Sequence, residues 1–461
     1  TLSCIIIEIY SFAPTRKARK DIKRQMGASL LSTQPYKGTR DFYPEDMELR
    51  NWFFGKIREV LRLSAFEEYN GPMLESLDIY IAKSGEELAK QQTYNFTDRG
   101  GRQLAVRPEM TPTVARLVAA KMQQLNMPLR WFSIPNLYRN EQPQHGRLRE
   151  HWQINADIFG CDSYEADLEI IVTAISMLLA FGADESMFAV RINNRRFFND
   201  VIGHICGADT EEARKISKVI DRREKVTREE YIDALRALGL DDEKINTIES
   251  IYTMDVDAAT ALCPDSVGSK ELKVLFEALR ALGLDKYCRF DFGIIRGLDY
   301  YTGTVFEVFD KHPDNRRAMF GGGRYDNLVG LFAKNAHIPG VGFGCGDVTL
   351  EHFLRSHGLI PESFGKCVKV LVTRFDDVAP EEYVRICMAL RNAGIVAAQY
   401  LGSKKFGKQI EYALKGGYSH ILIMGASEFA AGQIKIKALD THEETTVSLE
   451  ALMSNPKAFL A

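Results

Sequence analysis

Two strand-like stretches separated by a short polar turn set the strongest constraint on the fold of this chain. They are expected near 131–137 and 151–159, with the turn at 140–146 between them. Strands joined by so short a turn pair antiparallel, whereas parallel strands need a long crossover connection. No phosphate loop of the GxxxxGK[ST] type occurs anywhere in the sequence. The pattern therefore predicts an antiparallel sheet rather than a βαβ array.

Helical periodicity flanks this sheet on both sides in the sequence. Pro44 opens a segment whose apolar residues between 49 and 61 fall on one helical face, and proline is favoured in a first turn. A second helix is expected at 111–124. The mostly apolar run 170–183 is too short to span a bilayer and is expected to be a buried helix. Together these elements predict an α+β domain in which helices flank an antiparallel sheet.

The chain of 461 residues is longer than one ordinary domain. Amphipathic helices fill its middle, where the string ALRALGLD occurs twice, each time as a helix that ends in a glycine cap. The tail alternates strands and helices, and its apolar runs VKVLVT and HILIMG are typical of strands buried on both faces. The expected divisions are a disordered leader at 1–35, a core at 36–194, a helical insertion at 195–285, the rest of the core at 286–362 and an α/β domain at 363–461.

The first 25 residues join an apolar patch to a later basic one. A secretory signal has the opposite order, basic before apolar. We expect a leader without a structural role, with Met26 as a candidate start. A basic organellar presequence stays open as the alternative, and the sequence does not decide whether residues 1–25 belong to the native protein.

Charge and cysteine usage narrow the class of partner and the compartment. The net charge is −3, so contact with nucleic acid has to use local basic patches rather than an overall positive charge. The eight cysteines are scattered without CxxC spacing, which fits reduced thiols in a cytoplasmic protein. No metal site is predicted from the cysteine spacing.

Three polar motifs carry the candidate chemistry. The run 138–141 with Arg147 and Arg149 places three arginines and a glutamate around a turn, which suggests a clamp for phosphate oxygens. The run 296–303 sets an arginine, a carboxylate and tyrosine hydroxyls between glycines that let the backbone approach a ligand. The run 321–326 begins with three glycines, which imply close approach or a tight bend. Taken singly, each motif could equally be a solvated turn or a packing feature.

Taken in order, five motifs resemble those of the histidyl-tRNA synthetase family. They are KGTRDFYP at 37–44, RPEMTPT at 107–113, YRNEQPQHGR at 138–147, RGLDYYTGTVFE at 296–307 and GGGRYDNLV at 321–329. The resemblance covers about residues 36–440, and RGLDYYTG is its most specific piece. It implies a class II synthetase-like α+β catalytic domain with an antiparallel sheet flanked by helices, a helical insertion and an anticodon-binding-like α/β domain.

The resemblance implies that the chain activates L-histidine with ATP and Mg2+ and then transfers it to histidine tRNA. Arg139 and Arg296 would be the catalytic residues, gripping the α-phosphate from two sides and stabilising its growing charge. Glu141 would read the adenine side and Arg147 would reach the outer phosphates. The implied ATP-binding residues are Arg139, Glu141, Arg147, Gln153 and Gly346.

Histidine recognition is implied at a second set of positions. Asp157 and Tyr301 would bracket the imidazole, one at each ring nitrogen, and Tyr300 would line the same pocket. A polar pair spaced across a ring rejects apolar isosteres, because a missing partner leaves buried polar groups unpaired. The implied histidine-binding residues are Glu109, Thr111, Arg139, Gln153, Asp157, Arg296, Tyr300 and Tyr301.

The family pattern also implies a cytoplasmic homodimer without a membrane segment, with the helix near 45–63 and the strand up to Pro72 at the dimer interface. Two positions depart from the family's motifs. Thr349 stands where many members carry an arginine that stacks on adenine, and His151 stands where many place a phenylalanine. Such changes leave one alternative from another class, a noncatalytic histidine-sensing regulatory subunit of ATP phosphoribosyltransferase.

Overall fold

The computed structural model describes residues 31–460, apart from 85, 145, 208–209, 221, 224–225, 296–299, 316, 335, 365–367 and 403. Most of the expected leader, residues 1–30, therefore lies outside the described residues, and so does Arg296. The chain divides into two compact units, 1–361 and 362–461. Each unit is described by itself below.

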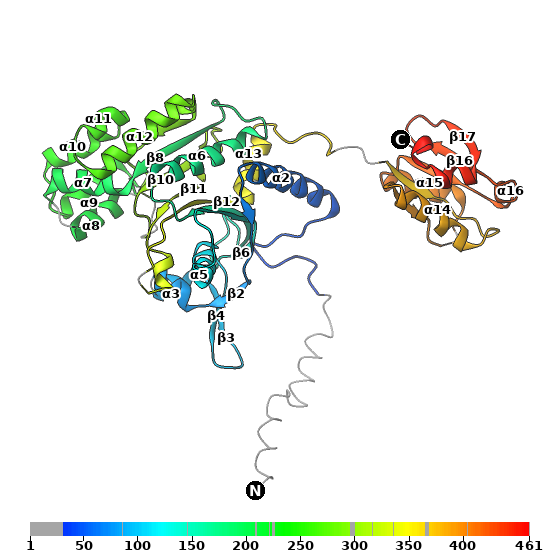
Figure 1. Ribbon diagram of the computed structural model, residues 1–461, viewed down its shortest axis with the longest axis horizontal. Helices are drawn as coiled ribbons and strands as arrows, with labels where there is room; N and C mark the ends of the chain where they lie inside the picture. The colour runs from blue at the N-terminus through cyan, green and yellow to red at the C-terminus, as the bar shows by residue number, and fades with distance from the viewer. Residues whose placement is uncertain are drawn as a thin grey trace, which may run out of the picture. The chain divides into compact units, whose positions relative to one another are not determined.

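The first unit is built on a nine-stranded sheet (Figure 1). Its strands follow the path β1-β5-β7-β12-β11-β10-β8-β9, and β6 pairs with β7 beside that path. They are β1 (Glu67–Glu68), β5 (Leu129–Ser133), β6 (Asn136–Tyr138), β7 (Glu150–Phe159), β8 (Phe188–Asn194), β9 (Cys288–Phe290), β10 (Thr304–Asp310), β11 (Ala318–Tyr325) and β12 (Gly340–Gly346). Pairing is antiparallel from β5 to β8, whereas β1 with β5 and β8 with β9 are parallel. The predicted antiparallel sheet is thus confirmed for its centre, with a parallel strand at each end.

Helices cover both faces of this sheet, because successive side chains of each strand point to opposite sides. The even-numbered side chains of β7 pack into a core with α2 (Pro44–Leu63), α6 (Tyr164–Leu179) and α13 (Asp347–Ser356). Phe159 instead packs with α5 (Thr111–Lys121) on the opposite face. The predicted stripe of α2 is confirmed, since Leu49, Phe53, Ile57 and Leu61 are buried. Helix α5 ends three residues earlier than predicted, and α6 begins six residues earlier.

A small second sheet lies in the same unit, with strand order β2-β4-β3. Its strands are β2 (Leu74–Ser76), β3 (Tyr94–Thr97) and β4 (Gln103–Val106), and the helices α3 (Asp78–Ser84) and α4 (Glu86–Gln92) connect the first strand to the second. Both strand pairs are antiparallel. The strand β4 leads directly into Arg107-Pro108-Glu109 and then α5, so this sheet fixes where α5 begins.

The helical insertion follows β8 and lies beside the β8–β10 end of the large sheet (Figure 1). Its helices are α7 (Arg195–Cys206), α8 (Thr210–Ile220), α9 (Arg228–Ala237), α10 (Asp242–Ile251), α11 (Val256–Thr260) and α12 (Val267–Ala281). Both copies of ALRALGLD end a helix as predicted. Gly239 and Gly283 have φ values of +87° and +67°, the left-handed conformation that glycine adopts readily at a helix end.

The second unit has a five-stranded sheet with the order β14-β13-β15-β16-β17. The strands are β13 (Lys369–Val372), β14 (Val396–Gln399), β15 (His420–Ile423), β16 (Gln433–Ala438) and β17 (Glu444–Ser448). The helices are α14 (Pro380–Asn392), α15 (Phe406–Lys415), α16 (Ala426–Ala430), α17 (Leu449–Ser454) and α18 (Lys457–Leu460). The pairs of β13 with β14 and β15 are parallel, and the other two pairs are antiparallel. The predicted α/β tail is confirmed, although α16, β17 and the last two helices were not foreseen.

Among the described residues, none of the helices is both long and apolar enough to cross a membrane.

The glycines of β11 and β12 meet at a distance that no other residue allows. A Cβ atom added to Gly322 would lie 2.0 Å from the carbonyl oxygen of Gly342 and 2.7 Å from the Cα of Phe343. We expect Gly322→Ala to destabilise the first unit by about 3 kcal/mol or more, because backbone atoms have to move apart. Urea unfolding followed by tryptophan fluorescence measures this unit, since Trp52, Trp131 and Trp152 all lie in it.

The matched control is Gly55→Ala in the exposed middle of α2, where an added Cβ meets nothing within 4 Å. Alanine is preferred over glycine in a helix interior, so this variant should be more stable than the wild type by about 0.5–1 kcal/mol. Equal midpoints for the two glycine variants would contradict the packing argument.

Candidate active site

The floor of the candidate site is the odd-numbered face of β7 together with the strand beside it. His151, Gln153, Asn155 and Asp157 share this face because side chains alternate along a strand. In the antiparallel register, Gln153 lies opposite Gly346, Asn155 opposite Gly344 and Asp157 opposite Gly342. Directly opposite residues share a face, so the polar side chains of β7 run beside a strip that carries no side chains.

This bare strip is closely overlaid by neighbouring side chains. A Cβ on Gly342 would lie 2.1 Å from Asp157 Oδ1, and a Cβ on Gly344 would lie 2.9 Å from the amide group of Gln153. A Cβ on Gly323 of β11 would lie 2.9 Å from the ring of Tyr301. The glycines therefore provide room for the side chains that the sequence marked as binding groups. The sequence left two explanations of the glycine run 321–323 open, close approach and a tight bend, and the structure shows close approach at Gly322 and Gly323.

The entrance to α5 brings Glu109 and Thr111 beside Arg139. The backbone N–H of Tyr138 donates to the carbonyl of Arg107 over 3.1 Å, which joins the two segments side by side. Arg139 Nε then donates to the carbonyl of Pro108 over 3.0 Å. A buried guanidinium supports the junction from beneath, since Arg107 donates to the carbonyls of Asn136 and Gly71. The guanidinium of Arg139 is therefore oriented by the segment that carries Glu109.

Four aromatic and acidic side chains gather at the inner end of the floor. The Tyr325 hydroxyl donates a very short hydrogen bond to Asp157 Oδ1. The Tyr300 ring meets the Tyr325 ring edge-on at 5.8 Å between centroids, and the Tyr300 and Tyr301 hydroxyls lie 3.4 Å apart. Tyr69 packs in the same apolar cluster as Tyr300, Tyr301 and Tyr325. Burial, and then the charge of Asp157, raise the pKa of its phenol. The result is a polar cluster with aromatic rings around it, in which Asp157, Tyr301 and Tyr325 are buried.

Burial dominates the chemistry of Asp157. The side chain is 4% exposed, and desolvation raises the pKa of the carboxyl to about 7, although the hydrogen bond from Tyr325 opposes the shift. A neutral hydroxyl stabilises a buried carboxylate less than a cation does. Near neutral pH this carboxyl can therefore exchange a proton with a basic ring placed against it.

His151 lies on the floor close enough to Arg139 to be affected by its charge. Burial first, then the charges of Arg139 and Arg40, lower the pKa of its imidazole to about 3. The ring is therefore neutral at physiological pH and presents an uncharged aromatic face to the floor. Such a face can pack against another flat ring, as a phenylalanine would.

The polar turn forms an outer rim around the site. Glu141 lies 3.8 Å from Arg147, whose side chain is 63% exposed and points into solvent. Arg149 is tied back, donating to the Glu141 carbonyl over 3.0 Å and to the Tyr36 hydroxyl over 2.7 Å. The three arginines of the predicted phosphate clamp therefore differ in position. Arg139 is directed toward the start of α5, Arg147 extends into solvent, and Arg149 hydrogen-bonds within the turn.

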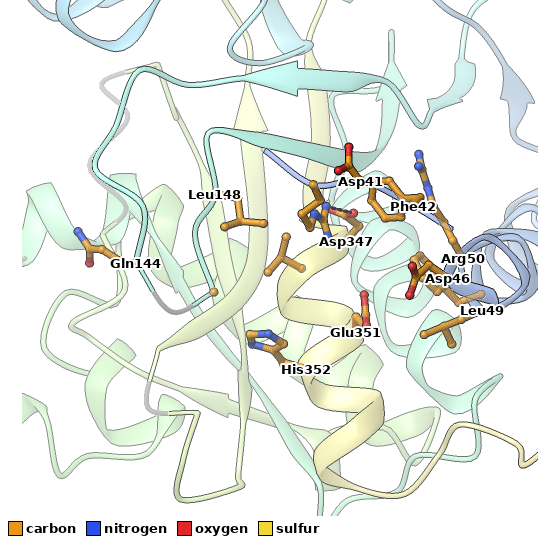
Figure 2. Close-up of a pocket in the computed structure, with 14 residues that line it drawn as sticks. Asp41, Phe42, Asp46, Leu49, Arg50, Gln144, Leu148, Asp347, Glu351 and His352 are labelled. Carbon is orange, nitrogen blue, oxygen red and sulfur yellow. Dashed lines mark hydrogen bonds and ion pairs between the residues drawn. The ribbon is translucent and has the colours of Figure 1, made fainter. Parts of the chain in front are cut away.

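A pocket of about 400 Å3 opens behind this rim, between α2, α13 and the turn (Figure 2). Neither Asp157 nor Tyr301 lines this pocket, so it is distinct from the cluster around Asp157. At its inner wall Arg40 pairs with the buried carboxylate of Asp347 at 2.6 Å, and Arg50 lies 3.5 Å over the Trp152 ring. The backbone N–H of Trp152 donates to Asp347 Oδ1 over 3.0 Å, which fixes the start of α13 against β7. The hydroxyl of Thr349 on the same helix lies within reach of the Met319 carbonyl at 2.8 Å and of the Gly346 carbonyl at 3.1 Å.

Most sequence-predicted residues therefore converge on one sheet face, although they come from five separate segments. The described members of the predicted set that lie on or beside the floor are Glu109, Thr111, Arg139, Gln153, Asp157, Tyr300, Tyr301 and Gly346. Arg296 falls outside the described residues. The sequence analysis gave no role to Tyr325 or Arg40, although both stand inside motifs that it quoted.

Comparisons with known proteins agree with this geometry. A family model described as histidyl-tRNA synthetase matches residues 38–346, and one described as anticodon binding domain matches residues 367–457. A histidine–tRNA ligase from Leptospira biflexa serovar Patoc is 44% identical over 437 residues, covering 94% of this chain and 99% of that protein.

Two solved structures share the fold. A histidyl-tRNA synthetase from Nostoc sp. PCC 7120 has a TM-score of 0.74 at 24% identity and covers 93% of this chain and 100% of its own. A Bacillus halodurans protein described as an ATP phosphoribosyltransferase regulatory subunit/histidyl-tRNA synthetase has a TM-score of 0.70 at 22% identity, with 85% and 98% covered. At these identities the structures establish the architecture alone.

The raised pKa of Asp157 predicts a pH-dependent stability difference. Between the ordinary carboxyl pKa of 3.8 and about 7, the folded chain holds a proton that the unfolded chain has lost, so this group destabilises the fold increasingly as pH rises. Asp157→Asn does not titrate and can still accept from Tyr325. Its stability relative to wild type should therefore increase by roughly 3 kcal/mol from about pH 5 to about pH 8. Urea midpoints read by tryptophan fluorescence check this, and a constant difference across that range would contradict it.

Proposed function

The chain belongs to the histidyl-tRNA synthetase family, and on that premise we propose how its residues divide the work. It is a histidine–tRNA ligase, a class II aminoacyl-tRNA synthetase that joins L-histidine to its tRNA at the expense of ATP. In the first step a carboxylate oxygen of histidine bonds to the α-phosphorus of ATP, and pyrophosphate leaves. In the second step the tRNA terminal hydroxyl takes the histidyl group and AMP leaves.

Arg139 is the proposed catalytic cation of the first step. Negative charge grows on the α-phosphate as the new bond forms, and a guanidinium that is already oriented stabilises it without reorganising. The 3.0 Å hydrogen bond from Arg139 Nε to the Pro108 carbonyl supports this assignment, because it fixes the side chain and leaves the terminal nitrogens available. Arg296 is proposed to act from the other side, on the strength of its motif. The substrate carboxylate is ionised near neutral pH, so positioning supplies much of the rate.

Histidine is proposed to bind between Asp157 and Tyr301, with Tyr300 lining the pocket. The observation that carries this proposal is a 4% exposed carboxyl whose described polar partner is a tyrosine rather than a cation. An imidazole N–H would give that carboxyl the donor that its burial demands. Glu109, Thr111 and Gln153 are proposed to hold the α-amino group, beside the carboxylate that Arg139 faces.

ATP is proposed to lie over the outer end of the floor, where Gly346 is less closely covered than Gly342 and Gly344. Gln153 and Gly346 pair across β7 and β12 at this end, and the neutral ring of His151 offers a flat face for adenine. Glu141 is proposed to read adenine, and Arg147 to reach the outer phosphates from its exposed position. Mg2+ is proposed to enter with ATP, because this ion usually bridges substrate phosphates and keeps several waters.

The noncatalytic alternative is less well supported. The anticodon-binding match at 367–457 gives the chain a second unit suited to tRNA, which a histidine sensor does not need. The 44% identical relative is a ligase by name. Arg139, Glu141 and Arg147 are all present around the turn.

The function is tested by histidine-dependent exchange of pyrophosphate into ATP, followed by charging of a histidine tRNA transcript. Wild type should perform both reactions. Arg139→Ala and Arg296→Ala should each lower the exchange rate by roughly 100-fold or more, since each removes a cation from the developing charge. The control is Arg280→Ala, which breaks an exposed pair with Asp257 at 2.9 Å in the helical insertion and should keep the wild-type rate. Histidine binding without either reaction, in folded wild-type protein, would favour the regulatory alternative.

A homodimer is proposed for the active form. Large apolar side chains are exposed around α2 and β2, including Tyr43 at 66%, Leu63 at 72% and Leu74 at 46%. These side chains lie on or next to the helix and strand that the family pattern assigns to the dimer interface, which supports the proposal. Sedimentation equilibrium should give twice the chain mass of 52.1 kDa, and Leu63→Glu should shift the mass towards the monomer. A wild-type monomer at micromolar concentration would contradict the proposal.

A cytoplasmic location is also proposed. The six cysteines that the structure describes are all unpaired, which suits a reducing compartment. Cell fractionation against compartment markers tests this assignment, and recovery in an organelle would contradict it.

A further inference from the structure

The strand β8 lies between β9 and β10, and this arrangement determines where the histidine motif begins and ends. The chain enters the motif from β9, which runs parallel to β8, and leaves it into β10, which runs antiparallel to β8. Thr304, the first residue of β10, lies opposite Asn194, the last residue of β8. Both flanks of the motif therefore start beside the end of β8, where the helical insertion begins.

Arg195, the first residue of α7, contacts both of these flanks. Its backbone N–H donates to the carbonyl of Gly303 over 2.8 Å. Its side-chain Nη1 donates to the carbonyl of Ile295 over 3.1 Å, and Ile295 is itself only 2% exposed. Ile295 and Gly303 enclose the stretch that contains Tyr300 and Tyr301. One arginine thus ties the entry of the motif to its exit.

The next residue, Arg196, reinforces the exit flank. Its Nη2 donates to Asp326 Oδ2 over 3.1 Å, and the same carboxylate oxygen accepts from the Thr302 hydroxyl over 2.6 Å. Thr302 also donates its backbone N–H to the carbonyl of Arg324 over 2.8 Å. Three groups therefore hold the exit flank: the Arg195 backbone N–H, the Asp326 carboxylate and the Arg324 carbonyl. At the entry flank, the Arg195 guanidinium supplies the side-chain contact with Ile295.

The helix that bears Arg195 is itself well anchored. The Asn194 side chain caps α7 by accepting from the backbone N–H groups of Arg196 and Phe197, and it donates to Glu271 on α12 over 2.7 Å. A cap of this kind fixes the direction of the first helical turn. The position of Arg195 is thus set by the insertion, while its contacts lie in the histidine motif.

We propose that Arg195 is a positioning residue of the reaction, through which the helical insertion holds the histidine-binding tyrosines in place. This inference rests on the proposed role of Tyr300 and Tyr301 at the substrate imidazole. Because Arg195 contacts both Ile295 and Gly303, Tyr300 and Tyr301 are held closer to the geometry that binds histidine, and less binding free energy is lost in ordering their side chains. Arg195 touches two main-chain carbonyls and needs no contact with substrate to have this effect.

The test measures KM for histidine and for ATP in pyrophosphate exchange. Arg195→Ala should raise KM for histidine by about tenfold, the usual effect of losing one hydrogen bond from a charged donor, and should change KM for ATP by less than about twofold. Arg195→Lys keeps a cation that can donate to one carbonyl, so it should recover part of the histidine affinity. The backbone tie to Gly303 persists in both variants.

The matched control is Arg223→Ala within the same insertion. Arg223 pairs with Glu249 at 3.0 Å and lies 4.0 Å over the Tyr252 ring, with 34% of its side chain exposed, and none of these contacts reaches the histidine motif. This variant should lower the urea midpoint while leaving KM for histidine at the wild-type value. A rise in KM for histidine equal to that of Arg195→Ala would show a merely structural role and overturn the inference.

A second reference variant, Asp157→Ala, separates failure of the inference from failure of the proposed site. It should raise KM for histidine far more than KM for ATP, because it removes the group proposed to bind the imidazole. If Asp157→Ala behaves so and Arg195→Ala changes neither constant, the positioning role is wrong and the site stands. If Asp157→Ala moves both constants equally, the histidine site itself is wrong, and the inference falls with it.

Discussion

The close approach of β7, β12 and β11 at positions without side chains governs the shape of the site. Gly342 and Gly344 leave space that Asp157 and Gln153 fill to within 2.1 and 2.9 Å of where a Cβ would stand. A single methyl group at either position would displace a binding side chain rather than a packing one. The glycines of β12 therefore give the polar side chains of β7 room to lie against the sheet, where they form the floor of the site.

Two equally buried carboxylates show how differently the same fold uses charge. Asp167 and Asp157 are each 4% exposed. Asp167 is paired with Arg324 at 2.6 Å, and that guanidinium also donates to the carbonyls of Cys161 and Ser163. Its charge is met within the protein, so the pair joins α6 to β11. Asp157 has a tyrosine hydroxyl instead, and the pKa of its carboxyl stays at about 7. A buried acid left without a cation is suited to a basic ligand, and it lowers stability until that ligand arrives.

Much of this arrangement could be predicted from the sequence, because local patterns specify local structure. The stripe of α2, the hairpin around residue 145 and the alternating tail each follow from periodicity and turn residues. The ends of α5 and α6 were placed too far along the chain, and for α6 a stop signal was present, since Gly182 has a φ of +89° just beyond the helix. The parallel strands β1 and β9 are too short to show a period of two, and their pairing depends on distant partners.

The site residues divide along the same line. Asp157 and Tyr301 came from family motifs, and no local pattern would have shown that Tyr325, almost 170 positions from Asp157, donates to it. The tie from Arg195 to Ile295 spans 100 residues in the sequence, because the insertion lies between them. The insertion leaves the sheet at the end of β8, and the chain returns as β9, which pairs with β8. The first turn of the insertion therefore lies against the segment that follows β9. Contacts of this kind exist only once the sheet has formed. The helical insertion therefore belongs to the site through topology, although none of its helices carries a residue of the predicted binding set.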